Sequence, residues 1–514
     1  REIVHRFINA AHRNGIEVFR VFDALNDIRN VVDNAEAIKA CGAHFEGAIS
    51  YTISPVHTLD SFLEYGQQLK DLGADSIAIK DMAGLLKPYA ARELVKALKD
   101  ALDIPIQLHT HDTSGNQNSM VLMAAEEGVD IVDLAVASMS SLTSQPSMNA
   151  VVAALEGQER DTGIDLMQLQ KLTDYWSDVR ERYTEFESDL KTPVTDIYRY
   201  EIPGGQYTNL KPQVESLGLG NRFVEVKEMY RTVNDMLGDL VKVTPSSKMV
   251  GDLAIFMVQH DLTPDNIVEK GKELSFPDSV ISYFKGMMGQ PAWGFPEELQ
   301  KVVLKGEQPI TCRPGELLPP ADFEAARTHL KGLMSGLISQ KDAKKLGELM
   351  QETGTNDPSD RAVISWCLYP KVYEEFLAKR REYGYISRLG SHIFFHGMAP
   401  GETSQVEIED GKTLVIKYVG LGELNAEGGR AVIFELNGVR REVTVVDQSA
   451  ADQVKKVPMA DPEDKLQIGA QIPGAVSKIF VKKGDAVTAG EVLAVIEAMK
   501  METSVLALAD GVID

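Results

Sequence analysis

The sequence of 514 residues is too long for a single hydrophobic core and indicates roughly two to four domains. Its 76 acidic and 53 basic residues give a formal net charge of −23, which argues against a nucleic-acid-binding surface. A composition of 44% hydrophobic and 25% charged residues is that of a globular protein and excludes wholesale disorder.

Three cysteines, Cys41, Cys312 and Cys367, lack the spacing of a disulfide framework. They predict a reducing compartment, for which we expect the cytoplasm. The sequence has no uncharged apolar run of the length that spans a bilayer, so direct membrane insertion is not expected.

Short apolar runs alternate with amphipathic helical stretches in residues 1–165. The strand-like runs are Ile16–Phe22, Phe45–Tyr51, Ser76–Ile79, Ile104–His111 and Val129–Val136, with helical stretches such as Thr58–Leu72 and Pro88–Leu102 between them. Repeated strand–helix units predict a parallel α/β sheet. No GxGxxG follows the first run, which disfavours a dinucleotide-binding sheet. We therefore predict a TIM-type (β/α)8 barrel that lacks its first strands, and expect the chain to be a fragment.

The pattern changes three times beyond the barrel. Residues 166–390 read as helical, and residues 391–448 read as short antiparallel strands between glycine-bearing turns. The predicted strands there are Phe394-Phe395, Gln405–Glu409, Thr413–Val419, Ala431–Leu436 and Glu442–Val446. A polar linker over 449–466 leads to a strand-rich segment, residues 467–514.

His109-Thr110-His111 closes the fourth apolar run. Residues two apart in a strand point the same way, so both imidazoles can face one metal ion. Functional residues of such barrels gather at the carboxyl ends of the strands. We predict His109 and His111 as ligands of a divalent metal, with a structural histidine pair as the alternative.

Lys80 ends the preceding strand. Ile77 and Ile79 share one face of that strand, whereas Ala78 and Lys80 share the other, which directs Lys80 into the barrel mouth. A protonated lysine would repel a metal ion, but a lysine carbamylated by CO2 supplies an anionic oxygen ligand. The alternative is a salt bridge from Lys80 to a neighbouring carboxylate, and spacing alone leaves both open.

Three motifs coincide in the last segment: Pro473-Gly474, the glycine-bounded stretch Gly484–Gly490, and EAMKMET at 497–503. A modified lysine that swings between two active sites needs an exposed tight turn on a rigid β scaffold. The segment resembles biotinyl carrier domains, and methionine on both sides of the lysine favours biotin over lipoate. We predict that Lys500 carries covalent biotin on a partial β-sandwich.

Six further blocks are similar to the carboxyltransferase domain of the pyruvate carboxylase family. They are VFRVFDALND (18–27), IAIKDMAGLLKP (77–88), LHTHDTSG (108–115), TSQP (143–146), IPGGQYTNL (202–210) and VTPSSKMVGDLA (243–254). Residues 391–448, with FFHGMAPGE and GKTL, resemble the tetramerisation (allosteric) region of the same family.

This resemblance implies a role for each matched residue. Carbamylated Lys80, His109 and His111 would hold Zn2+ or Mn2+, and the fourth ligand, an aspartate on the first barrel strand, would precede residue 1. Thr244 would relay a proton between the pyruvate methyl group and the biotin ring nitrogen, because a hydroxyl both donates and accepts. Without the resemblance, Thr244 reads as a turn threonine before Pro245. Asp23 matches an acidic active-site position.

The implied reaction is a metal-dependent transfer of a carboxyl group from carboxybiotin to pyruvate, through an enolate, giving oxaloacetate. No ATP-grasp module is visible, so a biotin carboxylase domain or subunit must carboxylate the biotin. The resemblance further implies a biotin protein ligase as partner and a homo-oligomer, in this family a tetramer.

Three alternatives remain open. Tyr51–Thr58 and Asn26–Asn30 look more like the α subunit of oxaloacetate decarboxylase, which runs the same half-reaction in reverse. Asp112, the blocks in 202–254 and the 391–448 region favour the carboxylase direction. The others are a metal-dependent lyase or Claisen-type synthase on a similar barrel, and a carrier module without catalysis.

Overall fold

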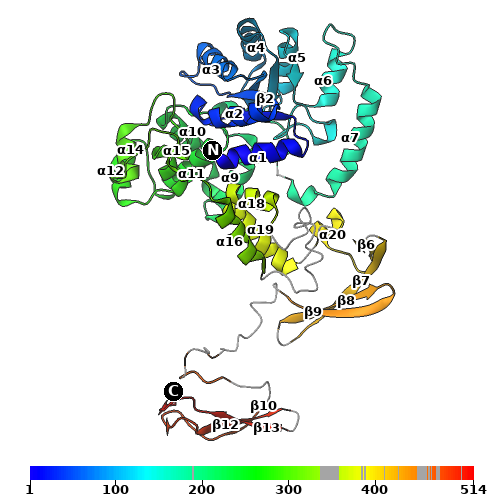
Figure 1. Ribbon diagram of the computed structural model, residues 1–514, viewed down its shortest axis with the longest axis vertical. Coiled ribbons are helices and arrows are strands. Elements are labelled where there is room, and N and C mark those ends of the chain that lie inside the picture. The colour runs from blue at the N-terminus through cyan, green and yellow to red at the C-terminus, as the bar shows by residue number, and fades with distance from the viewer. Residues whose placement is uncertain are drawn as a thin grey trace. The chain divides into compact units, whose positions relative to one another are not determined.

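A parallel sheet of five strands organises the N-terminal part of the computed structural model (Figure 1). The strands follow one another in the order β1 (Val18–Phe22), β2 (His44–Ser50), β3 (Ser76–Asp81), β4 (Ile106–Thr110) and β5 (Ile131–Val132). The accompanying helices are α1 (Glu2–Arg13), α2 (Val32–Cys41), α3 (Leu59–Asp71), α4 (Pro88–Leu102), α5 (Gln117–Glu126) and α6 (Met148–Leu155). The α/β fold predicted from the strand–helix alternation is confirmed, with β1 and β5 as the edges of the sheet.

The chain divides into two units, Arg1–Tyr385 and Ile386–Asp514. The structure describes residues 1–187, 190–335, 358–383, 386, 389–409, 411–425, 428–447, 460, 464, 466–469, 475–498 and 501–513. In these ranges, none of the helices combines the length and the apolar character needed to cross a bilayer. The division of the sequence into five parts stays a prediction.

The two faces of the sheet differ because side chains alternate along each strand. On one face, six apolar side chains are almost completely buried and pack in one core with α2–α5: Phe45, Ile49, Ile77, Ile79, Ile106 and Leu108. The register aligns Arg20 with Glu46 and Lys80 with His109, so the opposite face is polar. The fold therefore gathers polar side chains on one face of the sheet and apolar side chains on the other, under the helices.

Strand β5 is shorter than the predicted run Val129–Val136. Only Ile131 and Val132 pair with β4, opposite Gln107 and Leu108. Beyond them the backbone N–H of Asp133 still donates to the carbonyl of Leu108 at 2.9 Å, and the chain then leaves the sheet. Asp133 consequently lies directly at the carboxyl end of a strand.

Helices form most of the rest of the first unit. They are α7 (Leu166–Glu181), α8 (Ile197–Tyr200), α9 (Gly204–Ser216), α10 (Phe223–Met236), α11 (Ser246–Gln259), α12 (Ile267–Lys270), α13 (Asp278–Phe284), α14 (Glu297–Leu304), α15 (Pro314–Leu317), α16 (Phe323–Ser335), α18 (Asp360–Leu368) and α19 (Pro370–Tyr383). A second core built mainly from α9–α11, α13 and α14 includes fully buried Tyr230, Met249 and Tyr283. A small third core around Leu330 and Val363 joins α16 to α18.

The described part of the second unit contains a short helix and three antiparallel β-sheets. An antiparallel meander is formed by β6 (Thr403–Glu409), β7 (Lys412–Leu424), β8 (Gly429–Leu436) and β9 (Val439–Val446). Antiparallel strands β10 (Ala475–Ile479), β12 (Val492–Ala498) and β13 (Met501–Leu506) form one small sheet. Strands β11 (Ala486–Val487) and β14 (Gly511–Val512) form another.

One predicted strand is wrong. Phe394 and Phe395 lie in helix α20 (Ser391–His396), not in a strand. Adjacent aromatic residues favour strands, but Gly397 ends this segment at a φ of +71°, a conformation that stops a helix readily. The rings of His392 and His396, one helical turn apart, lie 5.4 Å from each other between centroids.

Leu98 of α4 tests the core between sheet and helices, because its side chain is fully buried. We expect Leu98→Ala to lower the free energy of unfolding by about 3 kcal/mol, since the cavity adds to the lost transfer energy. Tyr89→Ala on the same helix should change it by less than about 0.5 kcal/mol, because Tyr89 is 73% exposed. Urea denaturation followed by circular dichroism measures both, and equal losses would contradict this packing.

Candidate active site

The two imidazoles of His109 and His111 face each other at the carboxyl end of β4. Their Nε2 atoms lie 3.3 Å apart. Each ring is fixed through its other nitrogen: Nδ1 of His109 lies 2.8 Å from Oδ2 of Asp133, and Nδ1 of His111 lies 2.6 Å from the carbonyl oxygen of Thr143. The sequence-predicted pair is therefore brought together and held from outside.

The hydrogen-bond partners determine which nitrogen carries the proton. A carboxylate and a carbonyl oxygen only accept, so both Nδ1 atoms must donate. Burial lowers the pKa of His111 to about 4, although its bond to Thr143 acts in the opposite direction, and the ring is neutral near pH 7. A neutral ring protonated at Nδ1 has a lone pair at Nε2. His111 therefore turns a lone pair toward the other imidazole.

This arrangement fits a divalent metal ion. Two nitrogens bound to a tetrahedral Zn2+ at about 2.0–2.1 Å lie about 3.3–3.4 Å apart. The observed Nε2–Nε2 separation of 3.3 Å agrees with that requirement. Metal-binding histidines commonly donate their second ring N–H to a carboxylate or a backbone carbonyl, as both rings do here.

Lys80 lies beside the pair, because β3 and β4 align it with His109. Its Nζ lies 4.7 Å from the ring centroid of Phe22, and within the described ranges it forms no ion pair, which disfavours the salt-bridge alternative. Burial lowers the pKa of Lys80, and the positive charge of Arg20 lowers it further, against the opposing effect of Asp133. Both effects raise the fraction of neutral amine, the form that reacts with CO2.

The described residues contain no group of three His, Cys, Asp or Glu side chains close enough together to hold a metal ion. The sequence-predicted donors, two imidazoles and Lys80, include only two such side chains, and their role as metal ligands stays a prediction.

Asp133 joins three polar side chains at the site, and the sequence interpretation missed it. Its carboxylate accepts hydrogen bonds from His109, from Arg20 at 2.7 Å and from Gln107 at 2.6 Å. Burial acts to raise the pKa of Asp133, but the bonds from His109 and Arg20 outweigh it and hold the pKa well below its usual range. Arg20 also pairs with buried Glu46. A polar residue directly after a strand was the available signal.

The loop after β5 supplies the carbonyl that orients His111. Asp112 anchors this loop, because its N–H donates to the carbonyl of Ser144 at 2.8 Å and its carboxylate accepts from the hydroxyl of Ser141 at 2.9 Å. Thr143 lies between the two anchors. The TSQP block at 143–146 thus contributes through its backbone.

The loop after β3 passes close to the backbone of His111. Fully buried Asp81 accepts the backbone N–H groups of Leu85 and Leu86 and the hydroxyl of Thr110, which holds this loop on β4. Gly84 has a φ of +71°, and a Cβ built on it would overlap the carbonyl oxygen of His111. The position therefore requires glycine both for its backbone conformation and for the close approach.

Thr244 lies exposed at the turn that begins helix α11. Its neighbours Val241 and Val243 pack with Ala24, which follows β1, and with Met82, which follows β3. The turn that carries Thr244 therefore lies on the loops at the carboxyl ends of the strands, where Lys80 also lies.

Asp23 is used within its own loop. Its carboxylate accepts the N–H groups of Leu25 and Asp27 and the side-chain amide of Asn30, each at 2.9 Å. Burial raises the pKa of Asp23, although these bonds favour the ionised form. These contacts assign Asp23 to shaping the loop, and its catalytic role stays a prediction.

Lys500 lies outside the described residues, as do Met499 and the Pro473-Gly474 motif. The flanking strands are described: β12 pairs with β13 in antiparallel fashion, with Ala498 opposite Met501. Biotin attachment at Lys500 stays a prediction of the sequence.

Three family models match the chain in succession. Residues 3–175 match the HMGL-like family, residues 197–417 the conserved carboxylase domain, and residues 467–514 the biotin-requiring enzyme family. The first match includes the imidazole pair, the second Thr244, and the third Lys500.

Known proteins match nearly the whole chain. It is 45% identical over 518 residues to a pyruvate carboxylase of Staphylococcus aureus and 46% identical over 517 residues to one of Bacillus subtilis, with 99% of this chain covered in each case. The chain spans 43% of the length of each relative. A structure of the carboxyl transferase domain from Rhizobium etli pyruvate carboxylase with pyruvate and biocytin matches 87% of this chain and 73% of its own length, with a TM-score of 0.79 and 43% identity.

Gly84 provides a test of the site geometry, with Gly128 as a matched control. Both have a positive φ, but a Cβ on Gly128 would meet nothing within 4 Å. Alanine at either position should cost roughly 1–2 kcal/mol of stability. Only Gly84→Ala should also displace His111, and we expect it to weaken zinc binding at least about tenfold. Isothermal titration calorimetry measures the affinity, and equal zinc affinity of the two variants would contradict the geometry.

Proposed function

Because the chain belongs to the pyruvate carboxylase family, we propose that it performs carboxyl transfer from biotin attached to Lys500 onto pyruvate, giving oxaloacetate. It would be the carboxyltransferase and carrier part of a biotin-dependent ligase. The observation that carries the proposal is the facing imidazole pair beside Lys80 at the carboxyl edge of the sheet. That edge is where barrel enzymes assemble their active sites.

His109, His111 and a carbamate on Lys80 would hold the metal. A bound Zn2+ or Mn2+ would act as a Lewis acid toward the pyruvate carbonyl and stabilise the negative charge of the enolate. Asp133 and the carbonyl of Thr143 keep both rings in the orientation and tautomer that binding needs.

Lys80 would become a ligand by reaction with CO2. The lone pair of the neutral Nζ attacks the carbon of CO2, an N–C bond forms, one C=O π bond becomes the carbamate anion, and a proton leaves to solvent. The lowered pKa of Lys80 supports this step, because it raises the share of neutral amine near pH 7. Carbamylation would thus replace the positive ammonium group of Lys80, which repels a metal ion, by an anionic oxygen ligand, which binds one.

Thr244 would move the proton. Its hydroxyl can accept a proton from the pyruvate methyl group and donate its own to the biotin ring nitrogen, so the enolate forms without free hydroxide. Cleavage of the N–C bond of carboxybiotin would release CO2 and free the ring nitrogen to take the threonine proton, and the enolate carbon would attack that CO2 to form the new C–C bond of oxaloacetate. The position of the Thr244 turn on the strand-end loops supports this role.

The activity needs groups beyond this chain. We propose a biotin carboxylase domain or subunit that loads the biotin, a biotin protein ligase that attaches it to Lys500, and assembly into a tetramer in the cytoplasm. Support comes from the relatives, of whose length the chain spans 43%.

The alternatives are less well supported. Matches to pyruvate carboxylases over 99% of the chain favour the carboxylase direction over oxaloacetate decarboxylase. A lyase or synthase does not use biotin, so that function would not explain why residues 467–514 match the biotin-requiring enzyme family. A carrier without catalysis leaves the facing imidazoles unexplained.

Lys80→Ala in the full-length enzyme tests the proposed ligand. We expect at least about a hundredfold loss of oxaloacetate formation, because an alanine offers the metal no oxygen. ATP-dependent carboxylation of biotin should continue. The exposed Lys96→Ala on α4 is the matched control and should leave both rates unchanged. Retained oxaloacetate formation in Lys80→Ala, or a wild-type enzyme with neither metal nor a carbamate in its mass spectrum, would refute the site.

Lys500→Arg tests the carrier. Arginine keeps the charge but cannot form the amide, so we expect no biotin by streptavidin blot and no oxaloacetate from ATP, bicarbonate and pyruvate. Lys478→Arg, on strand β10 of the same segment, should retain both. Biotin found on the Lys500→Arg variant would place the attachment at another lysine.

A further inference from the structure

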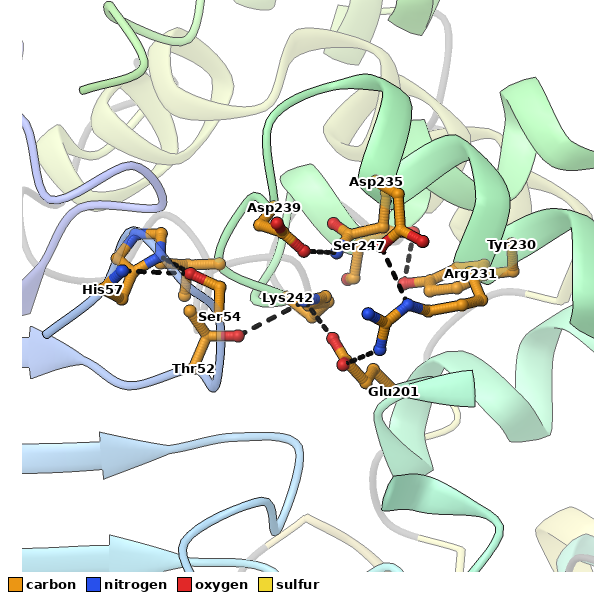
Figure 2. Close-up of polar contacts among 12 residues, drawn as sticks. Thr52, Ser54, His57, Glu201, Tyr230, Arg231, Asp235, Asp239, Lys242 and Ser247 are labelled. Carbon is orange, nitrogen blue, oxygen red and sulfur yellow. Dashed lines mark hydrogen bonds and ion pairs between the residues drawn. The ribbon is translucent and has the colours of Figure 1, made fainter. Parts of the chain in front are cut away.

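A lysine is buried completely next to the turn that carries Thr244. The side chain of Lys242 is 0% exposed, and its Nζ forms an ion pair with Glu201, whose side chain is 5% exposed. The Nζ also donates to the hydroxyl of Thr52 at 3.3 Å. Figure 2 shows Lys242 between Thr52 on one side and Glu201 on the other.

Glu201 is shared between two cations. Its second carboxylate oxygen accepts from Arg231 of α10, which also pairs with Asp235 at 2.8 Å (Figure 2). Removing a charge from water is expensive unless a partner compensates it, and two cations on one carboxylate make the cluster interdependent. Such a cluster holds its members in one arrangement and ties together the elements that carry them.

Those elements are far apart in the sequence. Thr52 follows β2, Glu201 follows α8, and Lys242 precedes α11. Lys242 therefore attaches the segment before α11 to the barrel loop after β2 on one side and to the turn after α8 on the other. The cluster performs none of the steps proposed for Lys80, the imidazole pair or Thr244.

The segment around Lys242 is held at further points. Val241 and Val243 pack against Ala24 and Met82, in the loops after β1 and β3. The hydroxyl oxygen of Ser246 closes the turn, because it lies 2.5 Å from the carbonyl oxygen of Val241 and 2.6 Å from that of Val243, which share its one hydrogen. Thr244 lies inside this closed turn, so a shift of Lys242 moves the threonine hydroxyl.

We propose that Lys242 is a positioning residue, whose buried ion pair with Glu201 and bond to Thr52 hold the Thr244 hydroxyl at the distance that proton transfer requires. This inference rests on the proposed function of Thr244. An error of about 1 Å in a reacting group lowers a rate about a hundredfold. The ion pair thus acts on the rate of the chemical step and not on the binding of pyruvate.

The experiment is Lys242→Met in the full-length enzyme, with oxaloacetate formation followed by fixation of labelled bicarbonate. Methionine keeps the length of the side chain and removes the charge. We expect kcat to fall about 10- to 100-fold, with the KM for pyruvate within about threefold of wild type. Biotin carboxylation should stay unchanged. Thr52→Val removes only the hydroxyl partner of Lys242 and should lower kcat in the same way but less.

A double-mutant cycle separates positioning from a general structural role. If Lys242 acts through Thr244, adding Lys242→Met to Thr244→Ala should lower kcat by less than about twofold further. If Lys242 had only a general structural role, the kcat losses of the two single variants would multiply in the double variant. Lys301→Met, which removes a lysine that is 66% exposed and also paired with a glutamate, is the matched control and should leave every rate unchanged.

Failure of this inference is distinguishable from failure of the proposed function. A wild-type enzyme that forms no oxaloacetate refutes the function itself. An active wild type whose Lys242→Met and Thr52→Val variants keep wild-type kcat overturns the inference. The inference is also overturned if the kcat losses of Lys242→Met and Thr244→Ala multiply in the double variant. It is overturned as well if Lys242→Met slows biotin carboxylation as much as it slows oxaloacetate formation. If Lys242→Met does not fold, Thr52→Val and its cycle with Thr244→Ala decide the question.

Discussion

The alternation of side chains along parallel strands is the constraint on which the rest of this structure depends. Covering helices demand an apolar outer face, supplied by residues such as Ile77 and Ile79. The same period turns Lys80 inward, and the register sets it beside His109. A slip of one residue would exchange the faces, burying charge under the helices and exposing the apolar core. Core stability and site geometry are therefore specified by one pattern.

The polar side chains on the inner face of the sheet need hydrogen-bond partners and counter-charges. Asp133 provides them for several of these side chains. Its carboxylate compensates Arg20 and orients His109, so an electrostatic requirement of the barrel interior also sets the tautomer of a candidate ligand. The carbonyl of Thr143 does the same for His111. These contacts leave both Nε2 atoms facing each other, and they lie outside the candidate metal site. Preorganisation of this kind is what a metal site needs to bind without rearrangement.

The remaining parts reach the site from the helical segment. Val241 and Val243 bring the turn of Thr244 onto the strand-end loops through apolar contacts, which give proximity without fixing an orientation. The buried pair of Lys242 and Glu201 adds the directional contact. Burial of such a pair is weak evidence for stability, because desolvation offsets much of the attraction. Its value lies in the single arrangement it permits, which suits the proton relay that we propose for the neighbouring Thr244 hydroxyl.

Local signals in the sequence determined the parallel sheet and most of the candidate site residues. The two-residue period turned Lys80 into the barrel mouth and set His109 and His111 to face the same way, and the strand–helix alternation predicted the parallel sheet. The same reasoning failed at Phe394, where aromatic residues favoured a strand but a six-residue helix formed. Helix or strand in so short a segment depends on its neighbours in space. Biotin attachment at Lys500 remains a prediction from the sequence motif, because Lys500 lies outside the described residues.

Tertiary structure alone decided the contacts between distant segments. Nothing near Asp133 in the sequence indicates that it orients His109, and nothing near Lys242 indicates Glu201 or Thr52 as partners. Periodicity reports which way a side chain points relative to its own backbone, but it carries no information on which remote backbone lies opposite. That choice is made when apolar faces pack and buried charges must each find a counter-charge, and both are properties of the whole folded chain.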